Sequence, residues 1–100
     1  MPGAPDAPAA PADAPTAANA VNVTNFAFVP QTLTVTVGAT VTWTNKDEEP
    51  HTVVSNDGST FHSKGLGTDQ TYSFTFSAPG TFDYTCSIHP FMHGTVVVTK

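Results

Sequence analysis

A thiol, an imidazole and a thioether lie within seven residues near the end of this chain. They belong to Cys86, His89 and Met92, at the spacing Cys-x2-His-x2-Met. A second imidazole is available far upstream, at His51 directly after Pro50. Soft sulfur and borderline nitrogen donors suit copper better than calcium or magnesium, and two His, one Cys and one Met are the ligands of type 1 (blue) copper sites. The four side chains therefore predict a site for one copper ion that cycles between Cu(I) and Cu(II).

Each of these residues taken singly also has an ordinary structural explanation. A lone Cys is most often a small buried apolar residue, and a lone Met usually fills a core. Cys86 is the only Cys of the chain, so it has no partner for an internal disulfide bond. The conjunction of all four side chains favours the metal site over four separate structural roles.

Length and charge narrow the possible partners. The chain has 100 residues, three Lys or Arg, eight Asp or Glu and a formal net charge of −5. Nucleic acids and anionic membranes require clustered basic residues, so neither is expected as a partner. No apolar run approaches the roughly 18 residues of a membrane span, so this chain is not expected to insert into a membrane. We expect a monomer.

Composition divides the chain into two parts. Residues 1–20 are mostly Ala, Pro and Asp, and such a segment buries too little apolar surface to offset its ordering entropy. We expect this segment to be a disordered tail or linker, and residues 21–100 to form one copper-binding domain. Met1 in front of the linker suggests a start codon that replaces an export or anchor segment.

From residue 21 onward, apolar and hydroxyl side chains alternate, as in strands with one buried face. The clearest alternation runs through 32–37, 40–44, 71–77 and 81–86. Turn signals separate these runs, and none has the period of a helix. The pattern predicts an all-β fold, an antiparallel Greek-key β-sandwich of seven or eight strands. Between Val23 and Phe26 the alternation slips by one residue, which suggests a bulge or a bend in the strand.

The strand pattern also orients the thiol. Phe82, Tyr84 and Cys86 share one face, so the thiol is expected on the core side at the end of its strand. The chain then turns and re-enters the sheet at Gly94. His51 is expected to open another strand after Pro50. Strands at both ends of a short ligand loop would hold the metal ligands rigidly.

Two blocks of sequence resemble the cupredoxins, the family of blue copper proteins. Residues 28–53 lead to His51, and residues 80–98 contain the Cys-x2-His-x2-Met loop. This loop is similar to the short loop of amicyanins, whereas plastocyanins and pseudoazurins place more residues before the Met. The resemblance implies that His51, Cys86 and His89 are the equatorial ligands and Met92 the weak axial ligand. His62 and His93 match no ligand position, and we expect both on the surface.

Two departures from the family pattern lie beside the ligands. Thr52 stands where the family often has Asn, and its hydroxyl could still tie the two ligand segments together. Ile88 stands where amicyanin-like loops often have Pro, and its backbone N–H is available to a thiolate. We expect N–H···S bonds to Cys86 from both Thr52 and Ile88. His51 should have an acceptor on its other ring nitrogen.

The resemblance implies an electron carrier rather than an enzyme. Its redox partners would dock transiently at the His89 end, where Ile88, Pro90 and Phe91 form an apolar collar around the imidazole. The acidic residues 47–49 could steer a basic partner. The expected location is periplasmic or otherwise extracytoplasmic, with the N-terminal linker as a possible tether. A protein that stores or delivers Cu(I) is the main alternative, because the same ligands hold Cu(I). A thiol enzyme is less favoured, because reactive thiols lie partly exposed beside positive charge.

Overall fold

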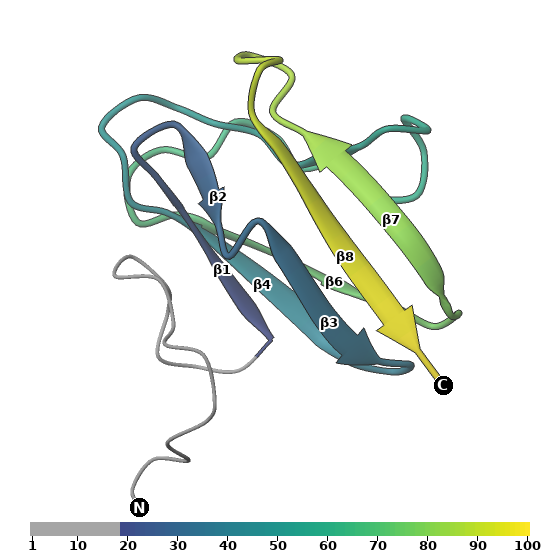
Figure 1. Ribbon diagram of the computed structural model, residues 1–100. Coiled ribbons are helices and arrows are strands. Elements are labelled where there is room, and N and C mark those ends of the chain that lie inside the picture. The colour runs from purple at the N-terminus through teal and green to yellow at the C-terminus, as the bar shows by residue number, and fades with distance from the viewer. Residues whose placement is uncertain (1–18) are drawn as a thin grey trace, which may run out of the picture.

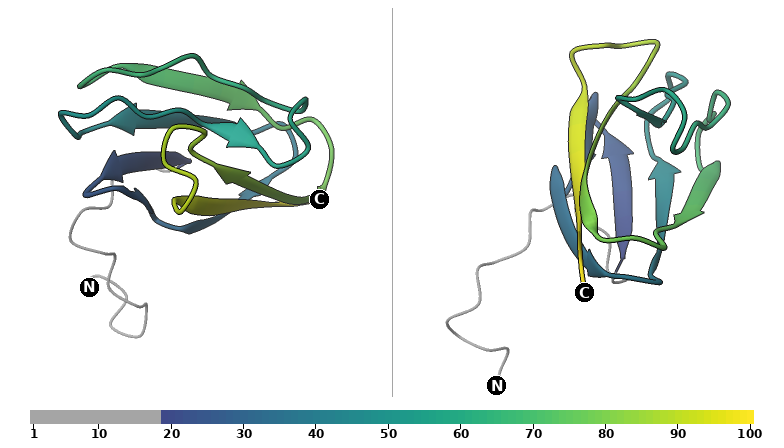
Figure 2. Two further views of the ribbon diagram at one scale, coloured as in Figure 1. Left: turned by 90° about the horizontal axis from the view of Figure 1, so that it is seen from above. Right: turned by 90° about the vertical axis from the view of Figure 1, so that its right-hand side faces the viewer.

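Two four-stranded β-sheets pack face to face in the computed structural model, which describes residues 19–100 (Figures 1 and 2). The predicted tail, residues 1–20, lies almost wholly outside the described residues, and its disorder stays a prediction. Ala20 already belongs to the first strand. Within the described part of the chain, no helix is long and apolar enough to span a bilayer.

The two sheets together contain eight strands in the described residues. The first sheet has the order β2 (Ala27–Val29), β1 (Ala20–Thr24), β4 (Thr40–Asn45) and β6 (Thr71–Thr75). The second has the order β3 (Thr32–Thr36), β8 (His93–Thr99), β7 (Gly80–Thr85) and β5 (Val54–Ser55). The predicted all-β sandwich is confirmed.

The pairing is not antiparallel throughout. Of the six strand pairs in these sheets, β1 runs parallel with β4, and β3 runs parallel with β8. Parallel neighbours require a long crossover connection. In both pairs, the chain between the two partner strands passes through the other sheet before it returns. Alternation reports which face a side chain takes but not the direction of the neighbouring strand, so the sequence could not show these two pairings.

The core lies between the sheets and follows the alternation. The inward side chains of β4, Val41 and Trp43, are fully buried. On the outer face, Thr42 shares a 2.8 Å hydroxyl hydrogen bond with Ser73 of β6. Burial of the apolar face supplies the main driving force, while such exposed hydroxyl pairs add little.

A two-residue turn joins β1 to β2. The slip in alternation at this point predicted a bulge or a bend, and that prediction is wrong: Thr24 pairs with Ala27, and Asn25 and Phe26 form the turn. Both turn residues have positive φ, 53° and 56°. Positive φ at both central positions is the requirement of a type I′ hairpin turn.

Three loops meet at one end of the sandwich. These are the β1–β2 turn, the segment between β4 and β5, and the loop between β7 and β8, which Figures 1 and 2 show at the end opposite the C-terminus. Strands anchor each of these loops on both sides. This end of the molecule contains the predicted metal ligands.

Candidate metal centre

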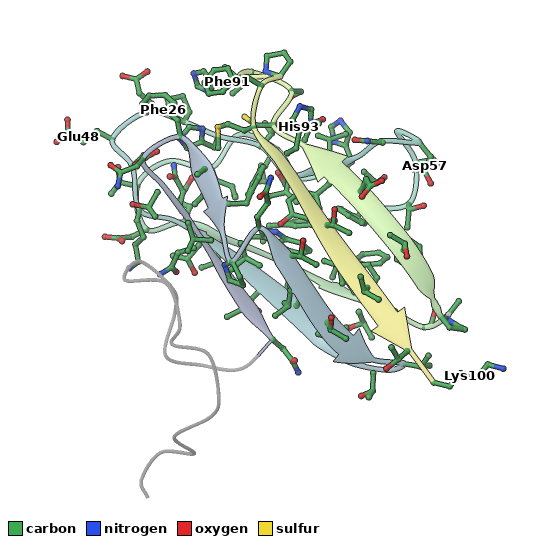
Figure 3. The ribbon with its side chains drawn as sticks, in the orientation of Figure 1. Phe26, Glu48, Asp57, Phe91, His93 and Lys100 are labelled. Carbon is green, nitrogen blue, oxygen red and sulfur yellow. The ribbon has the colours of Figure 1, made fainter. Side chains whose placement is uncertain are left out.

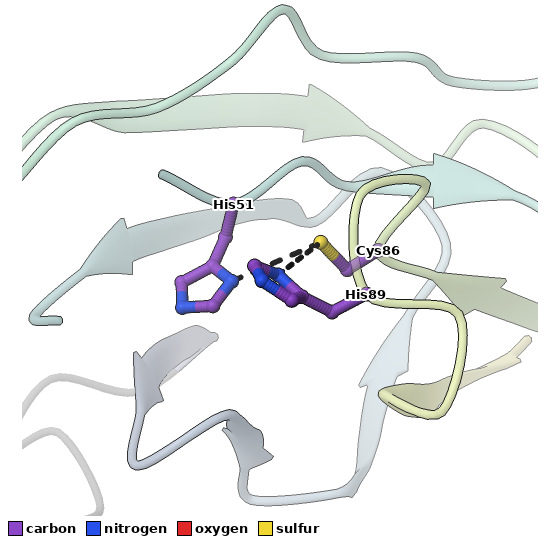
Figure 4. A group of neighbouring side chains, drawn as sticks. All are labelled: His51, Cys86 and His89. Atoms are coloured by element: carbon purple, nitrogen blue, oxygen red, sulfur yellow. Dashed lines mark hydrogen bonds between the residues drawn. The ribbon is translucent and has the colours of Figure 1, made fainter. Parts of the chain in front are cut away.

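Three of the four predicted ligands converge at this end of the sandwich. Atoms of His51, Cys86 and His89 that can bind a metal all lie within 4.8 Å of one another (Figure 4). The Sγ of Cys86 is 3.8 Å from Nδ1 of His51 and 3.7 Å from Nδ1 of His89. Two nitrogens and a sulfur therefore point at a common centre.

The β7–β8 hairpin places Cys86. The thiol follows the last residue of β7 and is fully buried, on the core face as expected. Across the hairpin, Thr85 pairs with His93, which fixes both ends of the loop. The Cys86 N–H donates to the carbonyl of Met92 at 3.2 Å, and the Met92 N–H donates to the carbonyl of His89 at 2.9 Å. The loop backbone thus connects all three of its predicted ligands.

Met92 is the fourth predicted ligand. Its side chain is only 2% exposed, and the loop bonds fix its backbone beside the cluster. A thioether is the soft, weak axial donor of type 1 sites. Its assignment as a ligand remains a prediction.

A backbone bridge and a carboxylate fix His51. The N–H of His51 donates to the carbonyl of Leu66 at 3.1 Å, and the N–H of Leu66 donates back at 2.7 Å. His51 therefore lies in an isolated bridge, and the strand expected to begin there begins at Val54. Its Nε2 lies 2.8 Å from Oδ2 of Asp47, which is the acceptor expected on the other ring nitrogen. A proton on Nε2 leaves Nδ1 free to bind a metal.

Asp47 connects His51 to the β1–β2 turn. Its Oδ1 accepts the N–H of Asn25 at 2.7 Å, and its Oδ2 accepts the N–H of Phe26 at 2.9 Å. Partial burial raises the pKa of Asp47, but these two N–H donors and His51 outweigh burial and hold the pKa below its usual value. Asp47 therefore has a structural role, and Glu48 and Glu49 are the exposed residues of the acidic run.

Thr52 ties the two ligand segments together, as expected. Its N–H donates to Sγ of Cys86 at 3.3 Å. Its Oγ1 accepts the N–H of Ser87 at 2.7 Å and lies 2.8 Å from the Ser87 hydroxyl and 3.7 Å from Sγ. A single arrangement satisfies all of these contacts: the Ser87 N–H and O–H donate to Oγ1, and the Thr52 O–H donates to sulfur.

The predicted N–H···S bond from Ile88 is wrong. Among the described residues, the Ile88 N–H is not a partner of Sγ, and the Ile88 side chain is 49% exposed. The backbone N–H of His89 contributes to lowering the pKa of the thiol, but less than the Thr52 N–H and the two imidazoles do.

These surroundings favour the thiolate form of Cys86. Burial raises the pKa of the thiol, but the Thr52 N–H and the bonds from His51 and His89 outweigh burial and lower the pKa from 9.0 to about 6. The thiolate is the form that binds metals. The donor set therefore fits a soft, thiophilic metal such as copper, at neutral pH. His62 and His93 are exposed and lie outside the cluster, as expected.

Sequence reasoning missed two residues of this centre. The Asp47 carboxylate lies four positions before His51, but only the tertiary structure shows that the same carboxylate binds the β1–β2 turn. Phe26 was not expected near the ligands, yet its ring centroid is 5.3 Å from that of His51 and 5.1 Å from that of His89. Asn25, a residue that tolerates positive φ, was the one available signal of a tight turn.

Fold and site together define a small β-sandwich with a metal centre of two imidazoles and a thiolate at one end. The sequence matches the family described as the cupredoxin-like domain over residues 5–98. The chain therefore belongs to the cupredoxin family, and the resemblance noted from its sequence is confirmed.

Known relatives point to one branch of this family. The chain is 46% identical over 68 residues to amicyanin-alpha of Methylorubrum extorquens, covering 64% of this chain and 57% of that protein. It is 44% identical over 70 residues to amicyanin of Paracoccus denitrificans, covering 66% and 53%. The chain thus spans little more than half the length of these relatives. A solved structure of a reduced Trp-to-Tyr mutant of amicyanin superposes with a TM-score of 0.77, at 36% identity and 87% coverage of both chains.

Proposed function

We propose that this protein is a type 1 copper electron carrier, with His51, Cys86 and His89 as equatorial ligands and Met92 as the axial ligand. The observation that carries the proposal is the convergence of two imidazole nitrogens and one thiolate sulfur within 4.8 Å. Bound copper would supply the one-electron couple Cu(II)/Cu(I). With that couple the protein would take one electron from a reduced partner and pass it to an oxidised one, with no bond of a substrate made or broken.

The protein's contribution is to hold the ligands still. Asp47 fixes the ring of His51, Thr52 joins the two ligand segments, and the β7–β8 hairpin closes the ligand loop. Ligands that move little between oxidation states keep the reorganisation cost of electron transfer small. Burial of Cys86 also excludes water from the thiolate.

The surface around His89 fits a transient encounter with a redox partner. Phe26, Ile88 and Phe91 are 40%, 49% and 67% exposed. Figure 3 shows Phe26 and Phe91 at the same end of the molecule as Glu48, with Lys100 at the opposite end. An apolar surface with carboxylates at its edge suits a redox protein that carries Lys or Arg around its own docking surface. Such encounters bury little area.

The proposal extends to an extracytoplasmic location, in which the Ala- and Pro-rich segment that precedes β1 tethers the domain. The similarity to amicyanins supports this location. Fractionation of cells that produce the protein natively tests it, because a cytoplasmic pool with no exported form would contradict the proposal.

Voltammetry of the copper-loaded protein tests the carrier function. We expect a reversible one-electron wave, and we expect rapid oxidation and reduction by soluble redox partners with basic docking surfaces. The competing function, storage or delivery of Cu(I), predicts a colourless protein that binds Cu(I) and releases it to a chelating acceptor without cycling. Irreversible loss of copper on the first reduction would therefore contradict the carrier proposal.

A further inference from the structure

The ring of Phe26 projects over the candidate metal centre from a turn that a Phe does not favour. A type I′ turn requires positive φ at both central residues, and Asn followed by Gly is the preferred pair. Here the second residue is Phe26, with φ 56°. A bulky side chain in this region is an outlier that persists only when surrounding contacts hold it. Phe26 therefore places an aromatic ring at a turn position whose backbone conformation favours Gly.

Asp47 holds this turn in place. Its two carboxylate oxygens accept the N–H groups of Asn25 and Phe26. Asp47 is itself fixed, because its N–H donates to Oδ1 of Asn45 at 2.9 Å and its carbonyl accepts the hydroxyl of Thr68 at 2.7 Å. The backbone under the Phe26 ring is thus anchored to the same loop that carries His51.

The Phe26 ring contacts both imidazoles edge to face. The planes of the Phe26 and His51 rings are at 90°, and those of Phe26 and His89 are at 83°, with centroids 5.3 Å and 5.1 Å apart. Phe26 also lies beside Phe91, at 6.4 Å and 35°. Edge-to-face contacts at these separations are attractive and directional. One ring therefore touches both imidazoles of the cluster.

His89 depends on this contact more than His51 does. The Nε2 of His51 has the carboxylate of Asp47, whereas in the described part of the chain no protein group is hydrogen-bonded to Nε2 of His89. The His89 ring also places Nδ1 beside the sulfur and packs against the rings of His51, Phe26 and Phe91. Phe91 lies on the same loop as His89 and is 67% exposed, so it offers a weaker constraint.

We propose that Phe26 is a positioning residue of the metal centre: its ring, anchored through Asp47, restricts the imidazole of His89 and limits its movement during electron exchange. This inference rests on the proposed electron-transfer function. Phe26 donates no ligand and accepts no electron. It acts through His89, the ligand nearest the surface at which partners would dock.

The first test uses the metal-free protein, so that it does not depend on copper. The substitutions are Phe26→Leu, which removes the ring, and Phe26→Tyr, which retains it. In NMR spectra, Phe26→Leu should shift the ring protons of His89 toward their values in an unstructured peptide and increase the motion of the imidazole. Phe26→Tyr should keep the wild-type shifts. Phe91→Leu is the matched control and should change the His89 signals less.

The second test uses the copper-loaded protein and measures the electron self-exchange rate. Phe26→Leu should slow self-exchange several-fold with copper still bound, and Phe26→Tyr should restore the rate. If Phe26→Leu destabilises the turn, Phe26→Met gives a second test, because it keeps a long apolar side chain without the ring and should move the same His89 signals. Unchanged His89 signals in Phe26→Leu and Phe26→Met, or a larger change in Phe91→Leu, would overturn the inference. Failure of the wild type to cycle would instead contradict the proposed function, leaving the metal-free NMR result in place.

Discussion

Replacing Thr52 by Val tests whether one hydroxyl ties the two ligand segments together. The substitution keeps the shape of the side chain and the backbone N–H that donates to the Cys86 sulfur. It removes an acceptor from the Ser87 N–H, bonded at 2.7 Å, and from the Ser87 hydroxyl, at 2.8 Å. Thr52 is only 6% exposed, so no water replaces its hydroxyl easily.

The expected cost follows from the groups left without partners. An unsatisfied buried polar group costs about 1 to 3 kcal/mol, and Ser87 lies at the surface, so we expect about 1 to 2 kcal/mol of unfolding free energy. For a domain of this size, each kcal/mol lowers Tm by about 4 to 8 °C. The substitution also removes the Thr52 O–H that donates to Sγ at 3.7 Å, but the blue colour should persist, because the shorter N–H···S bond remains.

The assay is urea denaturation of the metal-free and copper-loaded forms, together with hydrogen exchange at the Ser87 amide, which should become faster. Thr42→Val is the matched control, because it removes an exposed hydroxyl pair between β4 and β6. That change should stay within about 0.5 kcal/mol. Equal stabilities of Thr52→Val and Thr42→Val, with unchanged exchange at Ser87, would refute the reasoning.

Three further predictions concern the axial ligand, the packing behind the loop and the thiolate. Met92→Gln should keep a copper site but lower its reduction potential in voltammetry, because a harder oxygen donor favours Cu(II); an unchanged or higher potential would show that Met92 is not the axial ligand. Gly94→Ala should destabilise the domain by about 1 to 3 kcal/mol or more in thermal melts, because the new methyl group would overlap the buried ring of Tyr84. Gly65→Ala is the control, because open space surrounds that position, and equal Tm values of the two variants would contradict the packing argument. Folding lowers the pKa of Cys86 from 9.0 to about 6, so the unfolded chain binds more protons between these two pH values. The stability of the metal-free protein should therefore rise from pH 6 to pH 9 and be lost as pH falls through 6, with a gain over Cys86→Ala of at most about 4 kcal/mol. Parallel pH profiles of the two proteins would count against a thiolate.

The parts of the fold that sequence could predict are those that local pattern determines. Alternation along 40–44 and 81–86 identified strands and their buried faces, including the inward position of Cys86. Alternation carries no information on which strands become neighbours, so the parallel β1–β4 and β3–β8 pairs came only with the structure. The β1–β2 turn was missed for a related reason, because Phe26 occupies a position where a Gly would have signalled it.

The ligands were predictable because their chemical types and close spacing are unusual for a structural role. What surrounds them was only partly predictable. The Thr52 bonds followed from its place beside His51. The N–H···S bond expected from Ile88 is absent among the described residues, because the loop torsions decide which amide faces the sulfur. Asp47 binds both His51 and the β1–β2 turn because two loops that are distant in sequence lie side by side. A local sequence pattern cannot predict such a tertiary contact.

The most direct test of the copper site is the visible spectrum after one equivalent of Cu(II) is added to the metal-free protein. The wild type should turn intensely blue through charge transfer from the Cys86 thiolate to Cu(II), with a stoichiometry of one copper per chain. Cys86→Ala should bind copper weakly and lack this band. A colourless wild-type complex, or the same spectrum in Cys86→Ala, would contradict a type 1 site built on Cys86.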